Sequence, residues 1–341
     1  MRYTLLGDSG LRVSRMALGT MTFGTDWGFG GDATESRAQF DAFVEAGGNF
    51  IDTANKYTDG SAERLVGECI AGDRDRFVVG TKYSLSVHAG DPNGGGNSRK
   101  SLVRALEESL RRLDTDYVDI LWLHAWDYLT PVDEVMRALD DQVRLGKVLY
   151  LGISDTPAWI VAQAQTTAHL RGWNPFVALQ TQYSLVQRDS DRELLPMAEA
   201  LGLGVTAWGP LGSGVLSGKY DRRRPSDAGP RRLDEVPERS LEIAEGVVDI
   251  AAELDVTPSQ LSIAWLMHRE MIPVLGARTR EQFTANLAAA ELRLEPDVVE
   301  RLDALSRVEL GFPHDFLQES DWCNGGLIDS IDVPTGRRGS R

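Results

Sequence analysis

Short apolar runs alternate with amphipathic segments along most of the chain. Eight of these runs have the length and residue content of β-strands, at residues 16–19, 49–53, 77–82, 117–124, 148–154, 177–182, 204–208 and 273–277. The segments between and after them repeat apolar residues with helical spacing, which predicts helices at residues 34–46, 62–71, 98–113, 131–145, 157–171, 192–201, 240–254, 258–269, 280–290 and 296–305. Thr34 is expected to cap the first helix. Residues 3–6 and 11–13 predict a short hairpin ahead of the first strand.

The eight strands predict a closed barrel. Their continuous apolar character is typical of parallel strands that are covered on both faces. Eight strand–helix units in 341 residues favour an α/β fold of the (β/α)8 TIM barrel type over two open sheets, in a single domain that spans residues 1–341. We expect extra helices and loops near the C-terminus, and a loosely ordered tail over about residues 325–341. Such a barrel carries its functional residues at the C-terminal ends of the strands.

Composition and charge indicate an enzyme of the cytoplasm. The net charge of −15 disfavours a nucleic-acid surface, which needs clustered Lys and Arg. No apolar run approaches the roughly 20 residues that cross a bilayer, and the N-terminus lacks the apolar core of a signal peptide. Only two cysteines occur, which indicates a reducing compartment. We therefore expect a cytoplasmic enzyme without nucleic-acid or membrane partners, and the sequence leaves the oligomeric state open.

Four polar side chains lie at or just past the ends of three successive predicted strands. Asp52 lies at the end of the second strand, and Tyr57 follows five residues later. Lys82 ends the third strand, and His124 ends the fourth. Singly, Asp52, Tyr57 and His124 have ordinary explanations as a turn carboxylate, a packing tyrosine and a core histidine. Lys82 is unusual even alone, because a lysine that ends a buried strand loses hydration. Together at one end of one barrel, they favour an active site for proton transfer. The five histidines have no paired metal-ligand spacing, so no metal site is expected.

The four residue types suit the reduction of a carbonyl group. A tyrosine is a poor acid at neutral pH, because its ordinary pKa is roughly 10. We expect Lys82 to lower the pKa of Tyr57, and Asp52 to hold Lys82 by an ion pair. Tyr57 then serves as general acid toward a carbonyl oxygen that His124 orients. Protonation is only half of a reduction, so a hydride donor is implied.

Several motifs in this order resemble the aldo/keto reductase family. Asp52-Thr53-Ala54-Asn55-Lys56-Tyr57, with Gly60 and Glu63, is similar to the family signature around its catalytic Asp and Tyr. Further similar segments lie at residues 18–24, 147–155, 180–185, 208–220 and 272–286. The segments at 94–97, 126–127 and 150–159 look most like the aryl-alcohol dehydrogenase subgroup. Asp155 stands where many members have Asn, and Trp208 where Tyr is common.

The resemblance implies an NADPH-dependent reductase that works by direct hydride transfer. Trp208 would face the nicotinamide ring, and Arg278 would bind the adenosine 2′-phosphate through its fork of donors. The alternative for Arg278 is an exposed ion pair with a neighbour such as Glu281. The complete set of cofactor contacts that the resemblance implies is Gly19, Thr20, Met21, Asp52, Ser154, Asp155, Gln180, Trp208, Gly209, Pro210, Leu211, Gly212, Ser213, Lys219, Gly276, Arg278, Gln282 and Asn286.

The sequence indicates less about the substrate than about the catalytic and cofactor residues. Trp27, Trp126 and Tyr128 are candidates for an aromatic substrate wall, and each could equally pack beneath a long loop. We expect a small-molecule carbonyl substrate, with aryl aldehydes or aryl ketones ahead of the alternative of a keto-sugar or sugar nucleotide. A second alternative is a cofactor-sensing regulatory subunit of a membrane channel, which some proteins of this barrel type are.

Overall fold

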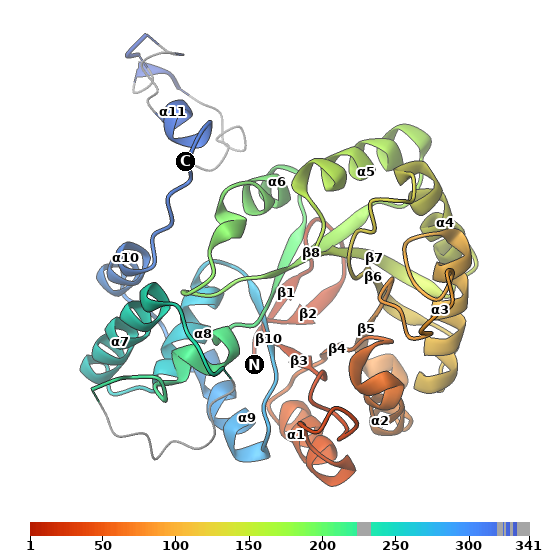
Figure 1. The fold of residues 1–341 in the computed structure, drawn as a ribbon, viewed down its shortest axis with the longest axis horizontal. Coiled ribbons are helices and arrows are strands. Elements are labelled where there is room, and N and C mark those ends of the chain that lie inside the picture. The colour runs from red at the N-terminus through yellow and green to blue at the C-terminus, as the bar shows by residue number, and fades with distance from the viewer. Residues whose placement is uncertain (224–232, 319–322, 324, 328–329, 333–341) are drawn as a thin grey trace.

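A computed structural model describes residues 1–223, 233–318, 323, 325–327 and 330–332 of the chain. Eight parallel strands close into a barrel in the order β10-β3-β4-β5-β6-β7-β8-β9 (Figure 1). The predicted TIM barrel is therefore confirmed. The strands are β3 Ala17–Gly19, β4 Phe50–Asp52, β5 Val78–Tyr83, β6 Val118–Leu123, β7 Val148–Ser154, β8 Phe176–Gln182, β9 Gly204–Trp208 and β10 Ile272–Leu275.

Helices surround the barrel and alternate with its strands along the chain (Figure 1). They are α1 Ala33–Glu45, α2 Ser61–Ile70, α3 Arg99–Leu113, α4 Val132–Arg144, α5 Ala158–Arg171, α6 Leu194–Ala200, α7 Glu238–Glu253, α8 Pro258–His268, α9 Arg280–Leu287, α10 Pro296–Leu305 and α11 His314–Gln318. Among the described residues, none of these helices is both long and apolar enough to cross a membrane.

The sequence-based boundaries differ from the structure in small ways. Thr34 is not the cap of α1, because the helix begins one residue earlier and the Asp32 side chain accepts the Glu35 N–H. The short helix α11 was not predicted. Residues 333–341, which end the predicted loose tail, lie outside the described residues. Residues 224–232, part of the predicted loop after β9, also lie outside them.

A predicted N-terminal hairpin is also confirmed. Strand β1 (Tyr3–Leu5) pairs antiparallel with β2 (Arg12–Ser14). Leu6 and Val13 are fully buried and pack with barrel-interior residues such as Phe50. The Asp8 N–H also donates to the Gly202 carbonyl oxygen just before β9, at 2.9 Å. The hairpin therefore covers the N-terminal end of the barrel and leaves the C-terminal end as the mouth.

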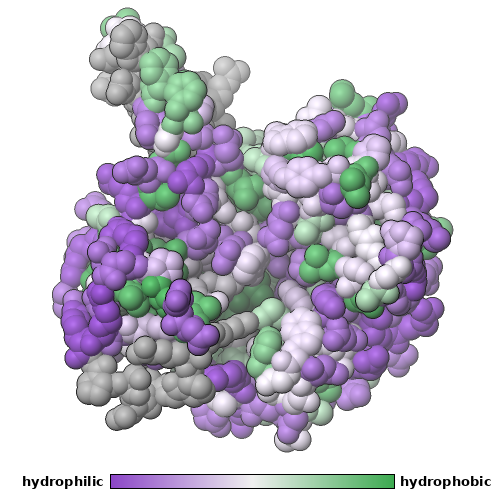
Figure 2. All heavy atoms as spheres, in the orientation of Figure 1, coloured by the Kyte–Doolittle hydropathy of each residue, from purple (hydrophilic) through white to green (hydrophobic). Residues whose placement is uncertain are grey.

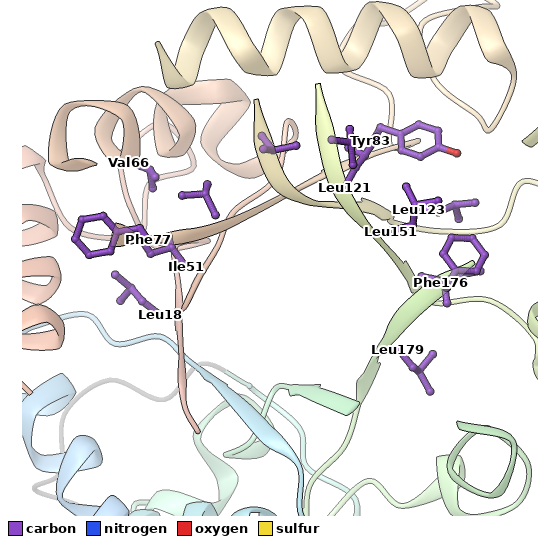
Figure 3. Close-up of a cluster of buried hydrophobic side chains, with 14 of the residues drawn as sticks. Leu18, Ile51, Val66, Phe77, Tyr83, Leu121, Leu123, Leu151, Phe176 and Leu179 are labelled. Carbon is purple, nitrogen blue, oxygen red and sulfur yellow. The ribbon is translucent and has the colours of Figure 1, made fainter. Parts of the chain in front are cut away.

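Strand side chains alternate between two apolar layers, one inside the barrel and one between the barrel and its helices. Outward-facing residues such as Leu18, Ile51 and Leu121 join helix residues such as Val66 in the largest buried cluster (Figure 3). Their neighbours in sequence point into the barrel, because successive strand side chains face opposite sides. Figure 2 shows the face of Figure 1 hollowed near the barrel axis, with apolar side chains inside the hollow.

Trp122 fills the barrel interior below the mouth. Its fully buried ring packs with other interior residues, including Phe50 and Ile120. Glycine is needed on both neighbouring strands, because a Cβ at Gly152 would lie 2.2 Å from the Trp122 ring and one at Gly80 would lie 2.7 Å from its Nε1. The indole therefore fills the interior beside Lys82, its register partner on β5.

Candidate active site

Asp52 and Lys82 form a buried ion pair inside the barrel mouth. Asp52 lies two residues after the inward-facing Phe50, and Lys82 lies four residues after the inward-facing Val78. Because alternate residues of a strand face the same side, both side chains enter the interior from neighbouring strands. The Lys82 Nζ atom lies 2.5 Å from Asp52 Oδ2 and 3.0 Å from the Thr53 carbonyl oxygen. Both side chains are almost completely buried. A buried charge needs such partners, because burial of an isolated ammonium is very costly.

Tyr57 and His124 complete the group that the sequence predicted. Tyr57 begins the short 3-10 turn Tyr57–Gly60, and its hydroxyl oxygen lies 3.0 Å from Lys82 Nζ. The Tyr57 and His124 rings meet edge to face, with centroids 6.0 Å apart. His124 Nδ1 is buried without a hydrogen-bond partner among the described residues. The phenol, ammonium, carboxylate and imidazole thus share one small volume.

Burial governs the protonation states of this group. It raises the pKa of Tyr57, and the nearby Lys82 charge lowers it only in part, so the net direction is upward. Lys82 lowers the pKa of Tyr57, as the sequence predicted, but burial raises it by more. Burial also lowers the pKa of Lys82, but Asp52 and Tyr57 more than offset it. Burial followed by the Lys82 charge lowers the pKa of His124 to about 3. At neutral pH the site holds a protonated phenol and a neutral imidazole.

Two further residues support the ion pair, and the sequence did not single them out for this role. Gln180 Nε2 donates to Asp52 Oδ1 at 3.0 Å, so each carboxylate oxygen has its own donor. Behind strand β5, the fully buried Glu63 accepts from Thr81 Oγ1 at 2.5 Å and from Arg112 Nε at 2.6 Å. The alternation of side chains along β8 predicts that Gln180 faces inward, so the sequence could have indicated its contact with Asp52. No sequence pattern indicated the Glu63 contacts, because they depend on how α2 and α3 pack.

Apart from Asp52, which ends β4, the residues proposed to bind cofactor lie along one arc of the barrel mouth. Strands β7, β8, β9, β10 and β3 are consecutive in the closed barrel, and β4, β5 and β6 complete the circle. The ends of the first five strands and the segments after them carry Ser154, Asp155, Gln180, Trp208, Gly209, Pro210, Leu211, Gly212, Ser213, Lys219, Gly276, Arg278, Gln282, Asn286, Gly19, Thr20 and Met21. Segments that are far apart in sequence therefore meet beside the catalytic arc, which is formed by the ends of β4, β5 and β6.

Features of this arc fit a dinucleotide with a phosphate at one end. Trp208 is partly exposed at the end of β9, and its Nε1 donates to Asp155 Oδ1 at 3.3 Å. Partial desolvation raises the pKa of Asp155, and the hydrogen bond from Trp208 lowers it in part. Gly276 is exposed just after β10. Arg278 pairs with no carboxylate among the described residues, so the alternative pairing with Glu281 is absent and its guanidinium is available for an anion.

The aromatic candidates lie on the rim of the same mouth. Trp27 Nε1 donates to Asp59 Oδ2 at 3.2 Å, which places Trp27 over the turn that carries Tyr57. Trp126 is half-buried, and its backbone N–H donates to the Asp155 carbonyl oxygen at 3.4 Å. Tyr128 is exposed and has a positive φ of 58°. Within the described part of the chain, no group of three His, Cys, Asp or Glu side chains is placed to hold a metal ion.

Comparison with known proteins agrees with this geometry. The family model described as "Aldo/keto reductase family" matches residues 15–307, which covers every barrel strand. This chain belongs to the aldo/keto reductase family. Family membership makes it an oxidoreductase, and the catalytic and cofactor arcs described above are its candidate active site.

Several similar curated proteins come from fungi. A norsolorinic acid reductase of Aspergillus flavus is 38% identical over 93% of this chain and 84% of its own length. An aryl-alcohol dehydrogenase of Pestalotiopsis microspora is 38% identical over 93% of this chain and 85% of its own. The NADP(+) aryl-alcohol dehydrogenase of Phanerodontia chrysosporium is 36% identical over 89% and 86%. The chain therefore belongs with the aryl-alcohol dehydrogenase-like aldo/keto reductases.

Proposed function

We propose that this protein reduces aryl aldehydes and aryl ketones to alcohols, with NADPH as the hydride donor and Tyr57 as the general acid. The observation that carries the proposal is the Tyr57 hydroxyl 3.0 Å from Lys82 Nζ, beside the ring of His124. This hydroxyl is a protonated donor at neutral pH, and burial in the barrel mouth keeps competing water away. The names of the similar aryl-alcohol dehydrogenases also support an aryl substrate.

The residues divide the reaction between them. The hydride for the carbonyl carbon would come from NADPH, held by the cofactor residues described above. Tyr57 donates its proton to the carbonyl oxygen, and the adjacent Lys82 charge stabilises the phenolate that remains. The neutral His124 donates one hydrogen bond to the same oxygen and orients it. Trp208 would hold the nicotinamide ring, and Arg278 would hold the adenosine 2′-phosphate.

The polar alternative, a keto-sugar or sugar nucleotide, has weaker support. Such a substrate needs several free polar groups near the carbonyl, and the nearest candidate is Asp127. Both Asp127 carboxylate oxygens are already used by its own loops, including bonds from the Asn97 and Thr130 backbone N–H groups at 2.7 and 2.9 Å. Their acceptor capacity is thus largely spent, which leaves the aromatic rim as the available recognition surface.

A turnover assay separates the enzyme from the regulatory alternative. Purified protein is mixed with NADPH and benzaldehyde, and loss of NADPH absorbance is compared with formation of benzyl alcohol. The proposal expects stoichiometric conversion, with ketoses and sugar nucleotides converted far less efficiently. Tight NADPH binding without turnover on any carbonyl would favour the cofactor-sensing role. We further propose a cytoplasmic location, which agrees with free thiols at Cys69 and Cys323.

A further inference from the structure

A groove with aromatic walls lies outside the catalytic group on the barrel rim. It has a volume of about 490 Å³ and lies between the loop after β6 and the start of helix α5. Trp126, Tyr128 and Leu129 line it from the loop, and Trp159 and Ile160 line it from the helix. The exposed fractions of Tyr128, Leu129 and Trp159 are 71%, 88% and 64%. Such a cluster of exposed large apolar side chains marks an interaction site.

Trp126 places one wall of this groove close in the chain to the catalytic His124. Trp126 comes two residues after His124, and its N–H binds the carbonyl oxygen of Asp155 at 3.4 Å. The carboxylate of Asp155 in turn accepts from Trp208. The groove walls also follow β6 and β7, which are hydrogen-bonded neighbours that end in Leu123 and Ser154. A ligand with its carbonyl at His124 can therefore extend its far end toward this groove.

The wall formed by the loop is held in shape before any ligand binds. Asp127 accepts hydrogen bonds from the Leu129 N–H and the Thr130 N–H and hydroxyl, at 2.8 to 2.9 Å. Asn97, which is fully buried, bonds reciprocally with Asp127 through the Asn97 N–H at 2.7 Å and the Asp127 N–H at 2.8 Å. A rigid aromatic wall binds at low cost in conformational entropy.

We propose that this groove is a second aromatic subsite, which binds the distal rings of an extended aryl carbonyl substrate. The proposal rests on the reductase function proposed above. Flat apolar rings suit the exposed faces of Trp159 and Tyr128, because offset or edge-to-face aromatic contacts are favourable there. Asp133 is the only charged residue among those that line the groove in the described part of the chain, so an anionic substrate tail is disfavoured. The subsite gives multi-ring carbonyls a lower KM than single-ring carbonyls.

Trp159→Ala tests the subsite with benzaldehyde, naphthaldehyde and anthracene carbaldehyde as substrates. Trp159 lies on the surface of α5, away from the four catalytic residues, so folding should be preserved. For naphthaldehyde and anthracene carbaldehyde, we expect KM to rise by about 3- to 10-fold with little change in kcat. The KM for benzaldehyde should stay within about twofold of the wild-type value. Trp159→Phe should restore most of the preference for multi-ring substrates, because it keeps an aromatic face.

Leu170→Ala is the matched control, because Leu170 is 77% exposed at the other end of the same helix. It should leave every KM unchanged. Equal KM values of the wild type for one-ring and three-ring aldehydes, or an unchanged multi-ring KM in Trp159→Ala, would overturn the subsite and leave the reductase function intact. A wild-type dimer that Trp159→Ala converts to monomer without change in KM would also overturn it, by identifying the groove as a contact between copies. Absence of turnover on all aldehydes would instead contradict the proposed function.

Discussion

The four residues at the barrel mouth influence one another through direct contacts: an ion pair, a hydrogen bond and a ring contact. Lys82 touches both Asp52 and Tyr57, so a change at any of the three alters the others. Gln180 supports Asp52 from the opposite side of the barrel, although 128 residues separate the two in sequence. Predictions at this scale therefore concern protons and charge rather than packing.

Tyr57→Phe should abolish most reduction while cofactor binding persists. The substitution removes the donated proton and keeps the ring that meets His124. The rate of reduction should fall by at least about 10²- to 10⁴-fold, which general acid catalysis typically contributes. Quenching of tryptophan fluorescence by NADPH measures binding and should remain close to wild type. Turnover at the wild-type rate would remove Tyr57 from the mechanism.

Lys82→Met should shift the pH dependence of alcohol oxidation to higher pH. In that direction Tyr57 acts as a base, and the Lys82 charge is what lowers the pKa of its phenol. The double variant Asp52→Asn/Lys82→Met is the control, because it also removes the carboxylate that would otherwise stay buried and unpaired. An alkaline shift in both variants supports the role of Lys82, and an unchanged pH–rate profile contradicts it.

His124 should make the protein less stable as the pH falls below neutral. Its pKa is about 3 in the folded protein against an ordinary value of 6.5, so between these values the unfolded chain binds a proton that the folded protein does not. The free energy of unfolding should therefore decrease as pH falls from about 6.5, by up to ~1.4 kcal/mol per pH unit from this group. In urea unfolding at about pH 7.5 and about pH 5.5, His124→Gln should show a smaller loss. An equal loss in both proteins would show that other groups control this pH range.

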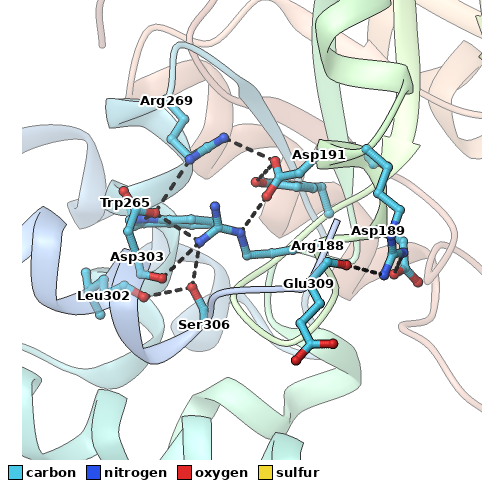
Figure 4. A network of polar contacts seen from close by, with 12 residues as sticks. Arg188, Asp189, Asp191, Trp265, Arg269, Leu302, Asp303, Ser306 and Glu309 are labelled. Carbon is cyan, nitrogen blue, oxygen red and sulfur yellow. Dashed lines mark hydrogen bonds and ion pairs between the residues drawn. The ribbon is translucent and has the colours of Figure 1, made fainter. Parts of the chain in front are cut away.

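At the scale of elements, a polar network joins the loop after β8 to helix α10 (Figure 4). Arg188 Nε lies 2.7 Å from Asp191 Oδ2, and Arg188 Nη1 lies 3.0 Å from Asp303 Oδ1 and 2.9 Å from Ser306 Oγ. Its guanidinium also lies 5.3 Å from the centre of the Trp265 ring on α8. One side chain therefore links three elements, and only 11% of it is exposed.

Arg188→Met should destabilise the protein by about 3 kcal/mol, as expected when one partner of a buried ion pair is removed. Arg192→Met is the matched control, since the Arg192 pair with Asp189 is solvent-exposed and should contribute less than about 1 kcal/mol. The free energy of unfolding in urea measures both. Similar losses in the two variants would show that the network does not connect the elements as the structure suggests.

For the whole molecule, ligand binding should raise stability with the logarithm of the ligand concentration relative to Kd. At a concentration 100 times its Kd, a cofactor adds about 2.7 kcal/mol to the free energy of unfolding. Arg278→Ala should weaken NADPH by about 10- to 150-fold, as loss of a charge-assisted hydrogen bond implies. It should therefore reduce the thermal shift with NADPH far more than that with NADH. Arg280→Ala is the control, because Arg280 lies 3.7 Å from Glu45 on the outer surface, and equal losses for both cofactors in Arg278→Ala would indicate a structural role.

The sequence by itself determined the order of strands and the identity of the four polar residues. Periodicity and strand length are local properties, so they predicted the barrel and placed Asp52 and Lys82 at strand ends. Only the tertiary structure decided which side chains touch. The Gln180–Asp52 bond, the Asn97–Asp127 pairing and the groove beside Trp159 all join segments that come together when the barrel closes. Burial is likewise a property of the closed fold, and it raises the pKa of Tyr57 by more than the nearby Lys82 charge lowers it.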